Sequence, residues 1–261
     1  MNHLELFSGT HSFGKVAKQH NFNVVSLDRD LDSTCPFSDY NSPHHIKEDI
    51  MKWNYKIYKP HHFHIITASP VCLWWSCLRT TWIGRKCKSI HPTDIITQEH
   101  IDNNIDKFGK PMIDKLFEII DYFKPKYYII ENPQTGKLKH YISEKYPQYN
   151  NYNDFSYCKF SNWGYEKKTR FWHNLPNIES CLCKKDCENI IEGTKRHKIN
   201  LASCRKVSDN GKIIRINTKA LREKYIDYKI IKDKCSSKFE RYRIPEKLIH
   251  YLFEKISFSD N

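Results

Sequence analysis

The stretch HLELFSGTHSFGKVAKQHNFNVVSLD, residues 3–28, decides the fold class of this chain. Apolar residues in His3 to Phe7 predict a strand, the spacing in Ser12 to His20 predicts a helix, and Asn23 to Leu27 predicts a second strand that ends at Asp28. Strand, tight turn, helix and strand in so short a span form a βαβ unit. We therefore expect an α/β protein with a doubly wound sheet.

The turn of this unit carries a candidate ligand site. A nucleotide-like ligand needs small residues that let backbone N–H groups approach it, and a carboxylate at the end of the next strand for ribose hydroxyls. Gly9 and Asp28 meet these two needs. A lone glycine in an ordinary βα turn is the alternative, and these residues alone leave it open.

Outward from this unit, residues 65–76 read IITASPVCLWWS. The apolar run from Phe63 to Ile66 predicts a short buried strand, which Pro70 ends. The following loop brings Cys72 to the open edge of the sheet, where α/β proteins place their reactive groups. The alternative is a small buried hydrophobic residue beside two tryptophans.

A second strand delivers a carboxylate to the same edge. The apolar spacing of Gly109 to Phe123 predicts a helix, and Tyr127 to Ile130 then predicts a buried strand. The strand ends in Glu131-Asn132-Pro133. We expect Glu131 to point into the crevice that contains Cys72.

These segments resemble cytosine-5 methyltransferases of the phage or giant-virus type. Ser69-Pro70-Val71-Cys72 is similar to the family's Ser-Pro-Pro-Cys loop, with Val71 in place of the second proline, and residues 7–11 are similar to its Phe-x-Gly-x-Gly cofactor loop, with His11 in place of the second glycine. Glu131-Asn132 resembles a dipeptide on the strand after the catalytic one, and Lys167 to Arg170, within an expected strand hairpin over 157–172, resembles a basic motif. The segments follow the family's order across nearly the whole chain.

The resemblance implies a Rossmann-like, S-adenosylmethionine-dependent methyltransferase fold and assigns roles to residues. Cys72 would attack cytosine C6, Glu131 would bind the N3 and amino edge of the base, Asn132 would shape the loop, and Lys168 or Arg170 would steady the flipped base or its phosphate. The residues expected at the cofactor are Phe7, Ser8, Gly9, Thr10, Asp28, Arg29, Asp49, Ile50 and Pro70. The implied substrate is cytosine in double-stranded DNA, flipped out of the stack.

Composition sets limits on partners and on location. The formal net charge of +13 favours a polyanionic partner such as nucleic acid. The chain has no uninterrupted apolar run of membrane-spanning length and no secretory leader, so we expect an intracellular, non-secreted protein of the cytoplasm or nucleus. We also expect a monomer. The ten cysteines are then expected as thiols or metal ligands.

The expected organisation has three parts. Residues 1–172 form the catalytic and cofactor-binding domain, with a long irregular segment up to about Asp106 as a lid, and residues 242–261 form a helix that returns to it. Between them, residues 173–241 contain 17 Lys or Arg against nine Asp or Glu, which accounts for +8 of the net charge. The resemblance makes this interval a small basic target-recognition lobe.

The basic lobe also contains a cluster of metal-ligand residues. The candidate zinc ligands are Cys181, Cys183, Cys187, His197 and Cys204. Thiols without a metal are the alternative.

Two other functions compete with DNA methylation. A tRNA cytosine-5 methyltransferase would use the same catalytic residues. A relic that binds DNA or cofactor without turnover is suggested by His11 and Val71. An amino-methyltransferase fits less well, because that class has an aromatic residue where Cys72 stands.

Overall fold

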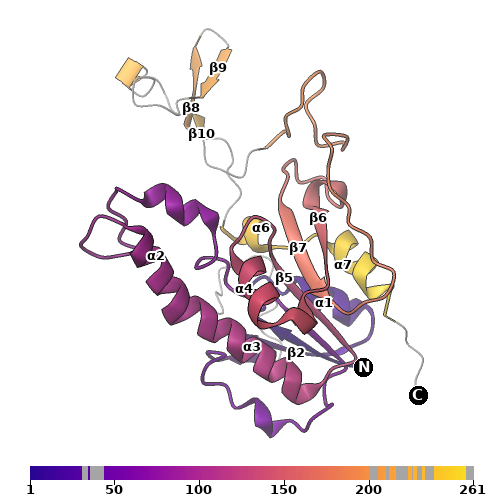
Figure 1. The fold of residues 1–261 in the computed structure, drawn as a ribbon. Coiled ribbons are helices and arrows are strands. Elements are labelled where there is room, and N and C mark those ends of the chain that lie inside the picture. Colours follow the sequence, from indigo (N-terminus) through magenta and orange to yellow (C-terminus); the bar gives the residue numbers. More distant parts are fainter. Residues whose placement is uncertain are drawn as a thin grey trace.

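The computed structural model describes residues 1–30, 35, 44–199, 205–209, 212–215, 223–224, 226–227, 231–232 and 238–256. Its centre is a seven-stranded sheet with the order β3-β2-β1-β4-β5-β7-β6 (Figure 1). The strands are β1 (Asn2–Leu6), β2 (Asn23–Asp28), β3 (His45–Lys47), β4 (Ile65–Ala68), β5 (Tyr127–Pro133), β6 (Tyr152–Ser156) and β7 (Lys168–His173).

Strand direction confirms the expected doubly wound α/β sheet. The strands β1 to β5 are parallel, and β7 runs antiparallel to both β5 and β6. From β1 the chain builds outward through β2 to β3, and it then returns to the other side of β1 as β4. The gap between the carboxyl ends of β1 and β4 is therefore the topological switch point, where such folds bind ligands.

Helices cover both faces of the sheet. They are α1 (Ser12–Gln19), α2 (Gln98–Asn104), α3 (Lys110–Phe123), α4 (Leu138–Lys145), α6 (Lys238–Tyr242) and α7 (Glu246–Phe253). Alternate residues of each central strand point to opposite faces. Ile66 and Ile130 accordingly pack with α3 and α4, and Ile65 and Ile129 pack with α1 and α7.

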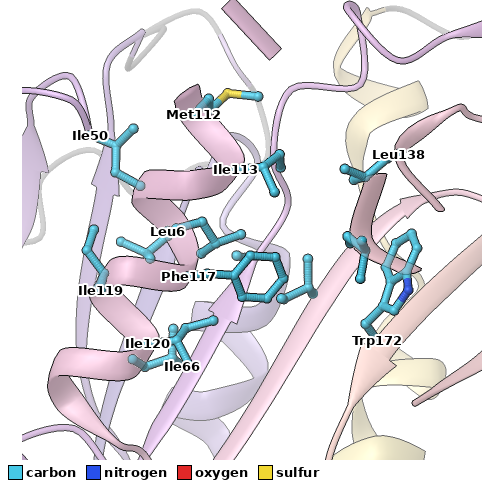
Figure 2. Close-up of a cluster of buried hydrophobic side chains, with 14 of the residues drawn as sticks. Leu6, Ile50, Ile66, Met112, Ile113, Phe117, Ile119, Ile120, Leu138 and Trp172 are labelled. Carbon is cyan, nitrogen blue, oxygen red and sulfur yellow. The ribbon is translucent and has the colours of Figure 1, made fainter. Parts of the chain in front are cut away.

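The expected helix over 109–123 is confirmed as α3, one residue shorter at its start. Its side chains Ile113, Phe117 and Ile120 lie over Leu6 and Ile66 in the larger core (Figure 2). This core fixes the strands that carry the site. None of the helices in the described ranges is long and apolar enough to cross a lipid bilayer.

The chain closes on its own beginning. The helix α7 buries Leu248 and Phe253 in the core cluster that contains Phe13 of α1. Just before it, the Ile244 N–H donates a 3.0 Å hydrogen bond to the Ser12 hydroxyl. Residues 242–256 thus pack beside the turn that follows β1, and residues 257–261 lie outside the described part.

Two expectations differ from the structure. The expected hairpin over 157–172 is wrong in its first half, because the first strand is β6 and Tyr157 already lies in a 3₁₀ turn. The aromatic residues in this stretch are buried because they anchor a loop, and they do not mark the alternating positions of a strand. The segment up to Asp106 is not wholly irregular either, because Thr97 and His100 form a capping box that starts α2.

The basic interval contains a small separate sheet. Its antiparallel strands are β8 (Arg205–Asp209), β9 (Lys212–Arg215) and β10 (Ile231–Lys232), in the order β10-β8-β9.

Candidate active site

The loops after β4 and β5 meet at the switch-point edge of the sheet. The Asn132 side-chain amide donates a buried 2.8 Å hydrogen bond to the carbonyl oxygen of Pro70. The chain leaves β4 at the same place, where the Ser69 N–H donates to the Leu6 carbonyl at 3.2 Å. These two hydrogen bonds fix the start of the Cys72 loop next to the strand that carries Glu131.

Two tryptophans fix the other end of the Cys72 loop. Trp75 is 2% exposed and its ring stacks on Tyr141 with the centroids 5.4 Å apart. A Cβ at position 109 would lie 3.1 Å from the same ring, so any larger residue there would crowd Trp75. Trp74 stacks on Phe108 at 4.9 Å. The tryptophans fill the space, and Cys72 itself stays partly exposed.

Glu131 is held by two donors that sequence reasoning did not assign. The carboxylate is 6% exposed, and its Oε1 accepts a 3.2 Å hydrogen bond from the Tyr157 hydroxyl. The Lys167 ammonium lies 3.5 Å from the same oxygen and also donates to the Arg241 carbonyl at 3.1 Å. Burial, reinforced by the Glu131 charge, raises the pKa of Tyr157 well above its ordinary value, so Tyr157 stays a donor.

The same charges act on Cys72. Burial raises the pKa of the Cys72 thiol above its ordinary value, and the Glu131 carboxylate adds to this effect, whereas the Lys167 ammonium opposes it. In the free protein the thiol form therefore predominates at neutral pH. If this sulfur acted as a nucleophile, the proton would have to leave as the sulfur attacks.

The side chains of Lys168 and Arg170 contact carboxylates other than Glu131, although Arg170 pairs with Asn132 in the register of β7 and β5. Arg170 makes a bidentate ion pair with Asp154, at 2.8 and 2.9 Å, and its guanidinium lies 3.5 Å from the centroid of the Tyr152 ring. Lys168 is 43% exposed and its ammonium is 3.8 Å from Glu166. Of the basic motif, Lys167 is the residue whose side chain contacts Glu131.

The turn after β1 is built on left-handed backbone. Phe7, Gly9 and His11 have φ of 55°, 48° and 51°. His11 stands where the resemblance puts a glycine, and it adopts the conformation that a glycine would favour. The departure in sequence is therefore compatible with the left-handed backbone that a glycine would favour at this position.

Asp28 joins the turn to the end of β2. Its Oδ2 accepts a 2.9 Å hydrogen bond from the Gly9 N–H, and its Oδ1 accepts one of 2.8 Å from the Asp30 N–H. Burial raises the pKa of Asp28, and these two backbone donors oppose that rise. A carboxylate has about four acceptor positions, so Asp28 keeps acceptor capacity for a ligand hydroxyl.

A buried glutamate beneath the turn was missed from the sequence. Glu5 Oε1 accepts from the N–H groups of Phe13 and Gly14 at 3.1 and 3.0 Å, and Oε2 accepts from the Ser26 hydroxyl at 2.9 Å. A side chain at Gly14 would lie 2.6 Å from Oε2. A carboxylate in the middle of an apolar strand was the available signal.

The remaining cofactor candidates lie beside the end of β2. Asp28 pairs with Lys47 in the register of β2 and β3, and Asp49 follows two residues later. The Arg29 guanidinium is 3.8 Å from the Asp49 carboxylate. Ile50 is 4% exposed and belongs to the larger core.

The edge fits a ligand with polar groups such as a nucleoside. At Gly9 a Cβ would meet nothing nearer than the Phe7 carbonyl oxygen at 3.9 Å, so the space beside its backbone is open. The buried Ser8 hydroxyl has no hydrogen-bond partner among the described residues. Thr10 is buried, and its hydroxyl lies 2.9 Å from the Ser12 hydroxyl.

The metal-ligand cluster has a different composition from the expected one. Cys183, Cys187 and His197 come together, but the residue that joins them is Cys158, from the turn after β6. Cys181 is not a member, because its backbone pairs with Asp154 and Ser156 along β6. Cys204 lies outside the described residues.

A viral relative, and not a family model, shows the family to which the chain belongs. No protein-family model matches it. The probable DNA (cytosine-5)-methyltransferase of frog virus 3 is 36% identical over 194 residues, which cover 73% of this chain and 79% of that protein.

One solved structure shares the fold at low identity, and a second aligns with a lower TM-score. The Entamoeba histolytica methyltransferase EhMeth aligns over 98% of this chain and 99% of its own, with 14% identity and a TM-score of 0.53. The Dnmt2 methyltransferase of S. pombe aligns over 71% of this chain with 13% identity and a TM-score of 0.42, and the present chain spans about half (52%) of its length. The sheet therefore has the Rossmann-like methyltransferase fold, and by its viral relative the chain belongs to the cytosine-5 DNA methyltransferase family.

Proposed function

We propose that this protein methylates C5 of cytosine in double-stranded DNA, with Cys72 as nucleophile and S-adenosylmethionine as cofactor. The observation that carries the proposal is the hydrogen bond from Asn132 to the Pro70 carbonyl, which holds the Cys72 loop against the strand of Glu131. A thiol and a buried carboxyl on adjacent loops suit an addition to a cytosine ring.

The reaction needs a nucleophile because C5 of cytosine is unreactive toward a methyl donor. Addition of the Cys72 sulfur to C6, with loss of the thiol proton, makes C5 an enamine carbon. Glu131 would contact N3 and the amino group, and a proton on its carboxyl group would withdraw electron density from the ring as sulfur adds. C5 would then take the methyl group of the cofactor, with the C5–methyl bond forming as the methyl–sulfur bond breaks. Loss of the C5 proton and expulsion of Cys72 from C6 would restore aromaticity.

The chain's own residues would hold the cofactor at the switch point. Asp28 would accept from the ribose hydroxyls, Asp49 would face the adenine, and the turn over residues 7–10 would pass along the body of the cofactor. When bound there, S-adenosylmethionine supplies an electrophilic methyl group. Pro70, whose carbonyl oxygen is held by Asn132, would lie beside the position of methyl transfer.

Within the basic motif, Lys167 would have a role that was not assigned to Lys168 or Arg170. Its ammonium, 3.5 Å from Glu131, counters the carboxylate charge and favours ionisation of Cys72. Arg170 would act as a positioning residue through Asp154.

DNA is the proposed partner because the net charge of +13 favours a polyanion and because the viral relative is a probable DNA methyltransferase. In a duplex, the target atoms are buried in the base stack. Residues 173–241 would form the target-recognition lobe, and residues 242–261 would return to the catalytic domain. Flipping the base costs a few kcal/mol, roughly the worth of several phosphate contacts.

The decisive experiment compares methyl transfer from labelled cofactor to duplex DNA and to tRNA, with bisulfite sequencing of the DNA product. Methylated cytosine in duplex DNA is the expected result. Turnover on tRNA alone would replace the proposed substrate, and binding of both ligands without methylation would indicate an inactive relic.

A further inference from the structure

We propose that Cys158, Cys183, Cys187 and His197 bind a structural zinc ion that fastens the start of the basic segment to the catalytic sheet. Their ligand atoms all lie within 4.8 Å of one another. Three thiolates and one imidazole, with no place left for water, are the donor set of closed structural zinc sites. The proposal concerns metal content and is independent of the proposed reaction.

Interatomic distances match a tetrahedral ion. With Zn–S near 2.3 Å and Zn–N of about 2.0–2.1 Å, tetrahedral geometry separates sulfur from nitrogen by roughly 3.6 Å. Nε2 of His197 lies 3.7 Å from Sγ of Cys183 and 3.4 Å from Sγ of Cys187. The protein thus already holds these donors at the spacing that zinc requires.

Backbone contacts bring Cys158 and Cys183 together. The Cys183 N–H donates at 3.0 Å to the hydroxyl of Ser156, the last residue of β6. Asn189 is 3% exposed, and its amide donates to the carbonyls of Cys158 and Ser161 at 2.9 and 2.7 Å. A loop from beyond β7 is therefore aligned against the turn after β6.

A short hairpin presents the other two ligands. An antiparallel bridge joins Ile190 to His197, and the Ile190 N–H donates to the Cys187 carbonyl at 3.1 Å. With Nε2 of His197 toward the thiols, Nδ1 lies 3.8 Å from the Glu166 carboxylate. At this distance the carboxylate acts on the imidazole through its charge and not through a hydrogen bond.

Another backbone group stabilises a thiolate. The Lys185 N–H donates to Sγ of Cys183 at 3.3 Å. The Lys185 side chain extends to Glu166, so a cation also lies beside the cluster. A zinc ion with three thiolates carries a net charge of −1, and the nearby ammonium group offsets that charge.

The segment needs such a cross-link because it has almost no core of its own. Among residues 181–199, all described, only Cys183 and Asn189 are buried. A metal supplies the free energy that apolar burial does not provide here. Cys158 directly follows Tyr157, the donor to Glu131, so the ion would also secure the turn that holds the catalytic carboxylate.

Metal analysis of the full chain, purified without chelator, tests the proposal. We expect about one zinc per folded wild-type chain. Cys158→Ser should lose most of it, while Cys181→Ser, from the same cysteine-rich stretch but outside the group, should keep it. Folded wild-type protein without zinc would overturn the proposal, and so would zinc lost from the Cys181 variant but kept by the Cys158 variant.

A second readout covers the case in which Cys158→Ser does not fold. Wild-type protein loaded with Co²⁺ should show the absorption of a tetrahedral cobalt site with thiolate-to-metal charge transfer. Cys158→His should keep a tetrahedral site with weaker charge transfer, since it has one thiolate fewer. Octahedral Co²⁺ without thiolate bands in the wild type would refute the site.

Discussion

The side-chain amide of Asn132 binds the carbonyl oxygen of Pro70 at 2.8 Å, and both groups are buried. Pro70 lies beyond the last paired residue of β4, so its carbonyl has no strand partner in the sheet. Asn132, near the end of β5, takes that place. This side chain thus links the loops that carry Cys72 and Glu131, and its replacement tests the arrangement directly.

Asn132→Asp should weaken both stability and activity. A carboxylate oxygen in place of the amide would face the Pro70 carbonyl, which replaces a hydrogen bond by repulsion. We expect a loss of about 1–3 kcal/mol in the free energy of unfolding and at least a tenfold fall in methylation rate. Urea unfolding and methyl transfer measure these. Asn54→Asp, at an exposed residue without a side-chain capping bond, is the control and should change neither.

Cys72 should become covalently bonded to its target. Duplex DNA with 5-fluorocytosine at the methylated position should trap the protein, because fluorine does not leave as the C5 proton does. Cys72→Ser should abolish trapping and methylation but keep cofactor binding. The exposed Cys77, on the same loop, is the control. Trapping that survives Cys72→Ser but not Cys77→Ser would identify a different nucleophile.

The reactivity of Cys72 should depend on Lys167. Burial raises the pKa of the Cys72 thiol, so its alkylation by iodoacetamide should accelerate as the pH rises above neutral. Lys167→Met removes the charge that lowers this pKa, so the profile should move to higher pH and alkylation at neutral pH should slow about three- to tenfold. Mass spectrometry of the Cys72 peptide measures the rate. Lys168→Met should leave it unchanged, and equal slowing in both variants would exclude a specific role for Lys167.

Cofactor affinity should depend on Asp28 and Asp49. In Asp28→Asn, the side-chain amide faces the Gly9 N–H either with its NH2 group, which cannot accept the hydrogen bond, or with an oxygen that lacks the carboxylate charge. Asp28→Asn should therefore weaken binding of S-adenosylmethionine about ten- to hundredfold. Asp49→Asn should have a similar effect. Calorimetry measures both, with Asp106→Asn, an exposed acid paired with Lys110, as the control. Wild-type affinity in both variants would place the cofactor elsewhere.

The basic segment should contribute phosphate contacts. Lys195, Arg196 and Lys198 are exposed on and beside the hairpin that presents His197. Their replacement by Ala should reduce the slope of log affinity against log salt by roughly 0.9 for each phosphate that is no longer neutralised. Fluorescence anisotropy with a labelled duplex measures the slope. Lys59→Ala, at an exposed residue before β4, should not change it, and an unaltered slope in the triple variant would remove these residues from the interface.

The parts of the fold that depend on local pattern could be predicted. The βαβ unit and α3 follow from apolar periodicity, and the ends of β4 and β5 bring Cys72 and Glu131 to one edge because parallel strands end together. The sequence did not show which of Lys167 and Lys168 points toward Glu131, because the direction of each side chain depends on where β7 begins and on how it pairs with β5. Spacing alone grouped Cys181 with its neighbours, whereas the group is completed by Cys158 from a distant turn.

The buried Glu5 also bears on which cofactors this fold can accept. In a dinucleotide-binding protein, the free N–H groups of the first helical turn after β1 bind a pyrophosphate. Here the N–H groups of Phe13 and Gly14, in that turn of α1, already donate to Glu5, whose carboxylate puts a negative charge where the phosphate would lie. A pyrophosphate at this turn would find these two donors occupied and would meet a negative charge, so we expect the turn to disfavour diphosphate-bearing nucleotides such as NAD. A nucleoside without a diphosphate would not meet this obstacle.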